Sequence, residues 1–176
     1  MNKKIDLDKI KIRLADESDL AAVVNLLADD ELGKNREVVD DNRNTDYGVS
    51  KNYLTAYNRI KNDPNHMLVV MDYFDEIVGT LQFIIIPTLT FNGCTRAEIE
   101  GVRIKSAYRQ LGLGKFFFKW VKETALKNNC GIIQLTTNNA RVGAQSFYKS
   151  LGFVDSHCGM KMMLEIDKIE IDKKII

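Results

Sequence analysis

An apolar strand that runs directly into a glycine-containing turn and then into a helix is the feature that most constrains the fold of this chain. The strand covers Ile99 to Ile104, the turn contains Arg109-x-x-Gly112-x-Gly114, and an apolar-periodic helix follows at once. Glycines at the start of a helix let the backbone approach a ligand closely, and the first N–H groups of the helix have no intrahelical partner. With the positive end of the helix dipole they form a site for phosphate, to which Arg109 adds a cation. The sequence therefore predicts a protein that binds a phosphorylated ligand.

The commoner phosphate-binding loops do not fit this turn. The chain contains no G-x-x-x-x-G-K-[ST] sequence, which argues against a P-loop nucleotide triphosphatase. A dinucleotide-binding fold has G-x-G-x-x-G after its first strand and an acidic residue about 20 residues later. Here the glycines follow residue 100, and no such acid follows a second strand. Taken alone, two glycines and an arginine also fit a strand-to-helix turn that binds nothing.

Three segments in a fixed order carry a more specific resemblance. They are Ala97-Glu-Ile-Glu-Gly-Val-Arg-Ile104, the turn that starts at Arg109, and Ala144-Gln-Ser-Phe-Tyr-Lys-Ser-Leu-Gly-Phe153. Together they resemble the GNAT family of acetyl-CoA-dependent N-acetyltransferases, over residues 10–164. The resemblance implies an α/β fold with a central mixed sheet and helices on both faces. It also implies acetyl-CoA as the co-substrate, with no metal.

The resemblance further implies which residues bind the cofactor. In the family, the strand before the turn pairs through its backbone with the pantetheine arm, the turn holds the pyrophosphate, and an Asn after the next strand often contacts the arm. The corresponding residues here are Val102, Arg103, Ile104, Arg109, Gln110, Leu111, Gly112, Leu113, Gly114, Lys115, Asn138 and Asn139. The commoner family Asn, three residues before the alanine, is replaced by Arg141, so the role of the two asparagines stays open. Arg103 fits an exposed strand residue equally well.

Tyr148 is the candidate proton donor. From the sequence alone, a tyrosine after Phe147 in an apolar helix fits core packing better than catalysis. The match to the family's A-x-x-F-Y-x-x-x-G-F segment reverses that preference, because the family tyrosine acts on the CoA sulfur. Not every member of the family depends on it for rate.

Glu98 and Glu100 are the candidate general bases. They lie two residues apart in a strand, so their side chains share one face, and the same alternation adds Val102 and Ile104 to that face. The Ala97-Glu-Ile stretch resembles the one that carries the base in histone-type members, which favours Glu98. Glu100 is closer to the turn. Both also fit solvated acids on a sheet face, so both are kept as candidates.

The remaining pattern predicts the other elements of a mixed sheet. Strands are expected at 10–14, 67–71, 77–91, 94–104 and 132–136, a final strand pair at 153–164, and helices from residue 16, from residue 50, at 112–127 and at 140–151. Asn92-Gly93 predicts a two-residue hairpin turn that pairs Phe83 with Val102 and Ile85 with Glu100, unless Pro87 shifts the register. The tail 166–176 fits either an edge strand or a loose segment.

Length and composition agree with one soluble domain. At 176 residues we expect a single N-acetyltransferase domain, 1–176, with its core at 10–164 and a tail at 165–176. A net charge of +1 favours neither a nucleic-acid nor a membrane partner. We expect a cytoplasmic protein, because there is no signal peptide and no long apolar run, and the three widely spaced cysteines fit reduced thiols. Two histidines offer no metal constellation, and the sequence is compatible with a homodimer.

The acceptor is less constrained than the reaction. A small-molecule primary amine is preferred, and the acidic stretch Asp29–Asp46 could attract a cationic one. The alternatives are a protein N-terminus or lysine as the acceptor, or an acyl-CoA-binding regulatory module without turnover. The presence of Tyr148, Glu98 and Glu100 argues against the last.

Overall fold

Five strands form one mixed sheet in the computed structural model, which describes residues 5–34, 36–37 and 46–164. The strands are adjacent in chain order: β1 (Ile10–Leu14), β2 (His66–Tyr73), β3 (Glu76–Ile86), β4 (Thr95–Ile104) and β5 (Cys130–Leu135). Neighbours run antiparallel from β1 to β4, and β5 runs parallel to β4. A parallel pair requires a crossover connection, and the helix after the glycine turn provides it.

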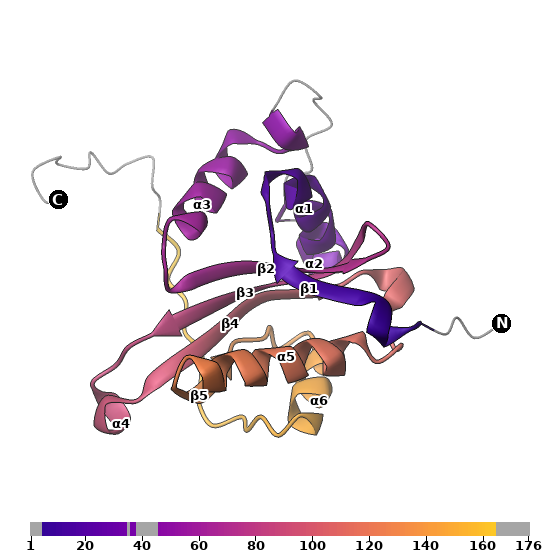
Figure 1. Cartoon of the computed structure of the whole chain (residues 1–176). Helices are drawn as coiled ribbons and strands as arrows, with labels where there is room; N and C mark the ends of the chain where they lie inside the picture. The colour runs from indigo at the N-terminus through magenta and orange to yellow at the C-terminus, as the bar shows by residue number, and fades with distance from the viewer. Residues whose placement is uncertain (1–4, 35, 38–45, 165–176) are drawn as a thin grey trace, which may run out of the picture. The chain divides into compact units, whose positions relative to one another are not determined.

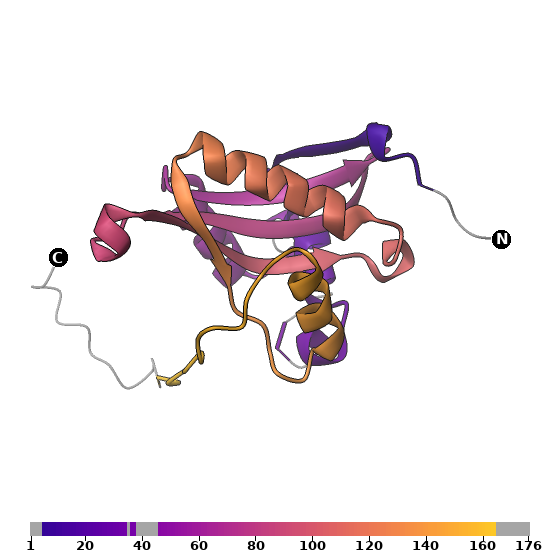
Figure 2. The same ribbon diagram turned by 90° about the horizontal axis from the view of Figure 1, so that it is seen from below.

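Helices cover both faces of the sheet (Figure 1). α1 (Leu20–Ala28), α2 (Glu31–Lys34) and α3 (Lys51–Lys61) lie on one face, and α5 (Leu113–Lys127) lies on the other, in front of the strands in Figure 2. On the α1 side, Leu20, Val24 and Tyr57 pack with Leu68 of β2. On the α5 side, Trp120 makes an edge contact with Phe83 of β3. Both predictions, the α/β class and the helices on two faces, are confirmed.

The central strands are apolar on both faces because both are covered. Val69, Val70 and Met71 of β2 and Val78, Leu81 and Phe83 of β3 are almost completely buried. Strands enclosed on two sides read as continuous apolar runs, without alternation. Full burial of one such side chain stabilises the fold by about 1.5–3 kcal/mol. The sheet is therefore a rigid base for residues at its edges.

Most predicted elements are present, with small shifts in their bounds. Asp16 caps the first helical segment as expected: its side chain accepts from Ser18 N, and Asp19 completes the capping box. The predicted helix at 140–151 is α6 (Val142–Ser150). The predicted strand at 67–71 is β2, which begins one residue earlier, at His66. α2 lies inside the acidic stretch Asp29–Asp46, of which residue 35 and residues 38–45 lie outside the described residues.

The predicted β3–β4 hairpin is wrong in its turn and its register. Phe83 pairs with Ile99 and Ile85 with Ala97, so each partner on β4 lies three residues before the predicted one. Pro87 has no N–H to donate to a ladder, and β3 ends at Ile86, directly before it. The strands are joined by a longer connection that contains α4 (Thr90–Gly93), in which Phe91, Asn92 and Gly93 all have positive φ.

The segment after α6 also differs from the prediction. No strand is present at 153–164 among the described residues, and the side chains of Val154, Met160 and Met162 are largely exposed. The tail 165–176 lies outside the described residues. The structure distinguishes two compact units, 1–137 and 138–176, which are described separately below.

Candidate active site

The turn after β4 has the backbone geometry that the glycine pattern predicted. Gly112 adopts a left-handed conformation (φ 89°, ψ −7°) and is the N-terminal cap of α5. Apart from Gly112 and its two chain neighbours, no described residue has an atom within 4 Å of the position that a Cβ would occupy there. The N–H groups of Leu113, Gly114 and Lys115 are in the first turn of α5, where helix geometry leaves them without intrahelical acceptors. The space beside Gly112 is thus open to a ligand at the positive end of a 15-residue helix.

Two acidic residues from distant parts of the chain hold this turn in place. Asp29, just after α1, accepts a hydrogen bond from Ser106 N at 2.7 Å and forms an ion pair with Arg109 at 3.2 Å. Glu76, at the start of β3, accepts from Lys105 Nζ and from the Tyr108 hydroxyl. The hydrogen bond to Glu76, together with burial, raises the pKa of Tyr108 to about 12. The sequence predicted neither of these contacts with the turn.

Arg109 therefore has a structural contact as well as its predicted place at the turn. Its Nε donates to the Ile104 carbonyl at 3.0 Å, and its Nη2 donates to the Asp29 carbonyl at 2.6 Å. The side chain is still 45% exposed, so the guanidinium carries its charge at the surface of the turn. Arg109 ties the end of β4 to the end of α1.

β4 separates from β5 immediately before this turn. The parallel ladder ends at the pair Ile99–Leu135, whereas β4 continues to Ile104. In the same stretch β4 carries an extra residue relative to β3, because Thr80 pairs with Arg103 while Gln82 pairs with Glu100. Gly101, inside this bulge, has a φ of 60°. An extended ligand could follow the β4 backbone from the turn toward Ile99 as an added strand.

The bulge changes which side chains share a face. Gln82, Glu98 and Glu100 lie on the α1 side of the sheet, and Arg103 joins them there, where its Nε lies 3.6 Å from Asp30. Ile104 instead lies beside Gly79 and Met71 on the α5 side. The expectation that Ile104 shares the face of Glu98 and Glu100 is therefore wrong, because an extra residue in a strand reverses the alternation beyond it.

The two candidate bases lie where the strands diverge, in different surroundings. Glu98 is half-buried between Ile84 of β3 and Gln134 of β5, and its Oε2 accepts from Gln134 Nε2 at 2.5 Å. Glu100 is exposed and lies opposite Gln82, not beside Ile85 as the predicted register had it. The predicted pairing of Glu100 with the apolar Ile85 is thus replaced by pairing with the polar Gln82. Gln82 in turn contacts His66 at 3.0 Å, and burial lowers the pKa of His66 below its ordinary value.

The second unit contains the other predicted residues. Tyr148 of α6 is half-buried, with its ring 5.8 Å from that of Phe153 in an edge contact and 5.4 Å from that of Phe147. Asn138 Oδ1 accepts from Ala140 N at 2.8 Å, and the Asn139 carbonyl accepts from Gln145 Nε2. Both asparagines thus shape the turn that leads to α6. His157 is exposed beside Ser156.

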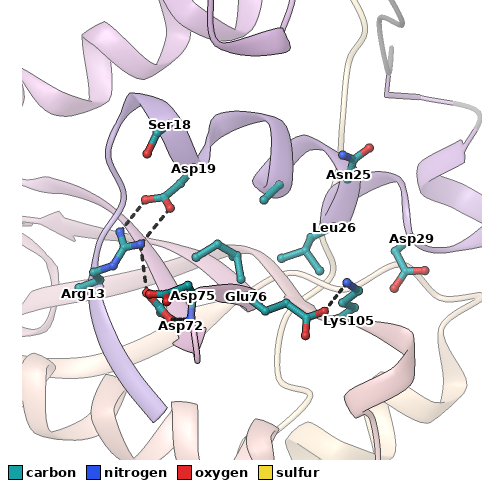
Figure 3. Close-up of a pocket in the computed structure, with 12 residues that line it drawn as sticks. Arg13, Ser18, Asp19, Asn25, Leu26, Asp29, Asp72, Asp75, Glu76 and Lys105 are labelled. Atoms are coloured by element: carbon teal, nitrogen blue, oxygen red, sulfur yellow. Dashed lines mark hydrogen bonds and ion pairs between the residues drawn. The ribbon is translucent and has the colours of Figure 1, made fainter. Parts of the chain in front are cut away.

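A cavity of about 540 Å³ lies between α1 and the start of β3 (Figure 3). It contains an ion pair network in which Arg13 contacts Asp19 at 2.6 Å and Asp72 at 3.4 Å. Hydrogen bonding to Asp19 holds the pKa of Arg13 above its usual value despite burial. The cavity also reaches the anchors of the glycine turn, Asp29, Glu76 and Lys105. None of the residues that line the cavity belongs to β4, so the cavity is separate from the edge where β4 diverges from β5.

Two classes of site are absent from the part of the chain that the structure covers. In the described ranges, no three His, Cys, Asp or Glu side chains are grouped so that they could bind a metal ion. None of the helices traced there has both the length and the apolar character needed to span a bilayer.

Comparison with known proteins agrees with this arrangement. The family model for the acetyltransferase (GNAT) family matches residues 22–153. A crystal structure described as a transcriptional regulator from Bacillus halodurans C-125 is 42% identical, covers 88% of this chain and 99% of its own, and superposes with a TM-score of 0.82. Two more distant structures share the fold.

One of these is glucosamine-6-phosphate N-acetyltransferase from Arabidopsis thaliana, with 20% identity over 89% of this chain and 99% of its own and a TM-score of 0.68. The other is a protein from Clostridium acetobutylicum, described as a predicted acetyltransferase with acetyl-CoA. It has 18% identity over 88% of this chain and 96% of its own and a TM-score of 0.65. The family match spans most of the chain and includes both the glycine turn and α6. This chain belongs to the GNAT family of acetyltransferases.

Proposed function

We propose that this protein transfers the acetyl group of acetyl-CoA to a primary amine of a small molecule, by direct attack in a ternary complex. The observation that carries the proposal is the divergence of β4 from β5 after Ile99, which leads directly to the Gly112 cap of α5. A pyrophosphate at the start of α5 and an arm along β4 would bring a thioester to the level of Glu98 and Glu100. GNAT enzymes as a family use acetyl-CoA.

The residues of this chain supply the groups that acetyl transfer requires. The neutral amine nitrogen attacks the thioester carbonyl carbon, a C–N bond forms, and the C–S bond breaks. One proton leaves the amine for a carboxylate, Glu98 or Glu100, and the sulfur receives one, for which Tyr148 is the proposed donor. Holding both reactants in line contributes about 7–11 kcal/mol to lowering the barrier.

The preference for a small cationic amine rests on local charge. Glu98 and Glu100 lie on the α1 side of the sheet, and α1 to α3 cover that side. Glu37 accepts a hydrogen bond at 2.9 Å from the hydroxyl of Tyr53 in α3. Carboxylates attract a protonated amine and can then accept its proton. A peptide or protein amine is the alternative acceptor.

A regulatory module that binds acyl-CoA without turnover is the second candidate. It is favoured by the 42% identical Bacillus halodurans protein, which is described as a transcriptional regulator. The two carboxylates at the divergence of β4 and β5 favour the enzyme, because binding alone does not require them.

Release of free thiol from acetyl-CoA, measured across a panel of primary amines, separates these functions. An amine acetyltransferase gives thiol release that depends on the amine, with a stoichiometric N-acetylated product by mass spectrometry. We expect the Glu98→Gln, Glu100→Gln double variant to lose about a hundredfold or more in turnover, with partial recovery at high pH, where the amine is already neutral. Tight acetyl-CoA binding without thiol release on any small or peptide amine would favour the regulatory module.

A further inference from the structure

The side chain of Gln134 on β5 links one candidate base to a half-buried cation. Glu98 and Gln134 are lateral neighbours across the β4–β5 pair, and Arg96 lies two residues before Glu98 on the same face. Gln134 Oε1 accepts from Arg96 Nη1 at 3.1 Å, while its Nε2 donates to Glu98 Oε2 at 2.5 Å. One amide thus contacts a guanidinium on one side and a carboxylate on the other.

These two partners determine the orientation of the amide. An arginine has only donors, so the carbonyl oxygen of Gln134 must point toward Arg96. An ionised carboxylate has only acceptors, so the NH₂ group must point toward Glu98. Amide orientation is often ambiguous in proteins, but the opposite arrangement would here oppose two donors on one side and two acceptors on the other. Gln134 therefore has one favoured state.

Arg96 is itself held from the opposite direction. Its Nη2 donates to the Thr90 hydroxyl at 2.7 Å, and its guanidinium lies 5.3 Å from the centre of the Phe91 ring. Both partners belong to α4, in the connection between β3 and β4. A continuous chain of contacts thus runs from α4 through Arg96 and Gln134 to the carboxylate of Glu98.

Glu100 lies in a different setting from Glu98. It is exposed, and the glutamine opposite it, Gln82, contacts His66. Of the two carboxylates that the proposed function requires, Glu98 is the one that Gln134 connects to the guanidinium of Arg96. Oε2 of Glu98 accepts from Gln134, and the proposed function assigns its other oxygen, Oε1, to the substrate.

We infer that Gln134 is a positioning residue that orients the Glu98 carboxylate for proton transfer, with Arg96 fixing the orientation of Gln134. This inference rests on the proposed acetyl transfer and makes Glu98, not Glu100, the base that the fold prepares. Gln134 does not touch the reacting atoms. It acts by holding Glu98 in one rotamer, since loss of alignment between a base and its proton lowers the rate without removing the base.

Substitution of Gln134 by methionine tests the positioning role. Gln134→Met keeps the length of the side chain and removes both contacts. We expect turnover with the best amine of the panel to fall roughly tenfold, less than the hundredfold range for a lost general base, with little change in the KM for acetyl-CoA. In a Glu98→Gln background, the same change should have almost no further effect. Gln82→Met, on the neighbouring strand, is the matched control and should keep wild-type turnover.

The outcomes divide clearly. Equal losses from Gln134→Met with and without Glu98 would overturn the inference, because the effect would then be general packing. A loss in Gln82→Met with none in Gln134→Met would overturn it in favour of Glu100.

A readout without turnover keeps the inference testable even if no amine is acetylated. In ¹H–¹⁵N spectra of the full chain, the two side-chain amide protons of Gln134 should be well separated and slow to exchange, and should shift in Glu98→Gln. If these signals were those of a solvent-exposed amide and did not respond to Glu98→Gln, the contact and the inference would both fail. Absent thiol release with intact amide signals would instead count against acetyl transfer alone.

Discussion

Gly112 and Gly93 have similar backbone conformations but lie between different elements of the chain. Their φ values are 89° and 77°, and at neither residue does an atom of the described chain, other than its immediate neighbours, lie within 4 Å of the place that a Cβ would take. Gly93 belongs to a connection between strands, whereas Gly112 begins a long helix after the diverging end of β4. Only the second position combines open space with the N–H groups of a long helix. The local motif predicted this, because strand, turn and helix follow one another without a gap.

Replacement of each glycine by valine separates backbone strain from ligand binding. A β-branched residue in the left-handed region is strained, so both Gly112→Val and Gly93→Val should lower the thermal midpoint by similar amounts. Only Gly112→Val should also abolish the thermal shift caused by acetyl-CoA, because its side chain fills the space beside the start of α5. A folded Gly112→Val protein with the full acetyl-CoA shift would contradict the phosphate-binding role of the turn.

Tyr148 is testable through its hydroxyl alone. Tyr148→Phe keeps the ring contacts with Phe147 and Phe153, so we expect the fold and the affinity for acetyl-CoA to change little. Turnover should fall if the hydroxyl donates a proton to the departing sulfur. Calorimetric binding and steady-state kinetics on the same preparation check both parts. Unchanged turnover would assign Tyr148 to packing, the role that its sequence context alone favours.

The acids that anchor the glycine turn could not be predicted from the sequence. Asp29 precedes Arg109 by 80 residues and Glu76 precedes Tyr108 by 32, and contacts across such separations leave no local pattern. The network Arg96–Gln134–Glu98 joins two strands whose pairing itself had to be known first. By contrast, the capping box at Asp16 was predictable, because all of its members lie within four residues.

At the scale of elements, local sequence signals predict where helices begin and end better than they predict how strands pair. The cap at Asp16, the cap at Gly112 and the bounds of α5 followed from short signals, and the structure reproduces them. The register of β3 with β4 was not predicted correctly. Asn92-Gly93 allows a tight turn, but β3 ends at Ile86, before Pro87, and so does not reach that turn. The bulge at Gly101 was also missed, since it becomes visible only when both strands are aligned.

The cap at Asp16 gives a pH-dependent prediction for the 3-10 turn Glu17–Asp19 that leads into α1. A hydrogen bond from the Ser18 side chain, with further backbone hydrogen bonds, lowers the pKa of Asp16 in the folded protein. Its stabilising effect is thus complete above about pH 4 and is lost as the pH falls through the lower, folded value. Asp16→Ala should cost about 1 kcal/mol at neutral pH in urea unfolding, and the difference from wild type should shrink in acid.

Asp16→Asn is the control for charge. Asparagine caps helices about as well as aspartate but does not titrate, so this variant should keep most of the stability at neutral pH. Its stability relative to wild type should rise as the solution becomes acidic. A constant difference between wild type and Asp16→Ala from neutral pH down into the acid range would show that the carboxylate charge is unimportant to the cap.

At the scale of the whole molecule, binding should complete the sheet. If the arm of acetyl-CoA pairs with β4, backbone amides at Gly101, Val102 and Ile104, and those at the start of α5, should exchange more slowly with deuterium when acetyl-CoA is present. Amides in β2, buried in the centre of the sheet, should gain only the protection that comes from overall stabilisation of the fold. At about 100 times the dissociation constant, the bound ligand should also stabilise the fold by roughly 2.7 kcal/mol.

Peptide-level hydrogen exchange checks this pattern directly. Protection limited to the turn, with none along 101–104, would mean that the phosphate end binds while the arm takes another path. Protection spread evenly over the sheet would mean general tightening of the fold and would argue against strand-like pairing of the arm.

The separation of β4 from β5 has a consequence for how the protein behaves in a crowded solution. Where a strand continues beyond its pairing with a neighbour, its backbone can pair with another extended chain, including one from a second molecule. A bound acyl-CoA would occupy that template and prevent self-association through it. The ligand would then prevent aggregation in addition to taking part in the reaction, and the protein would aggregate most readily at low acyl-CoA concentration.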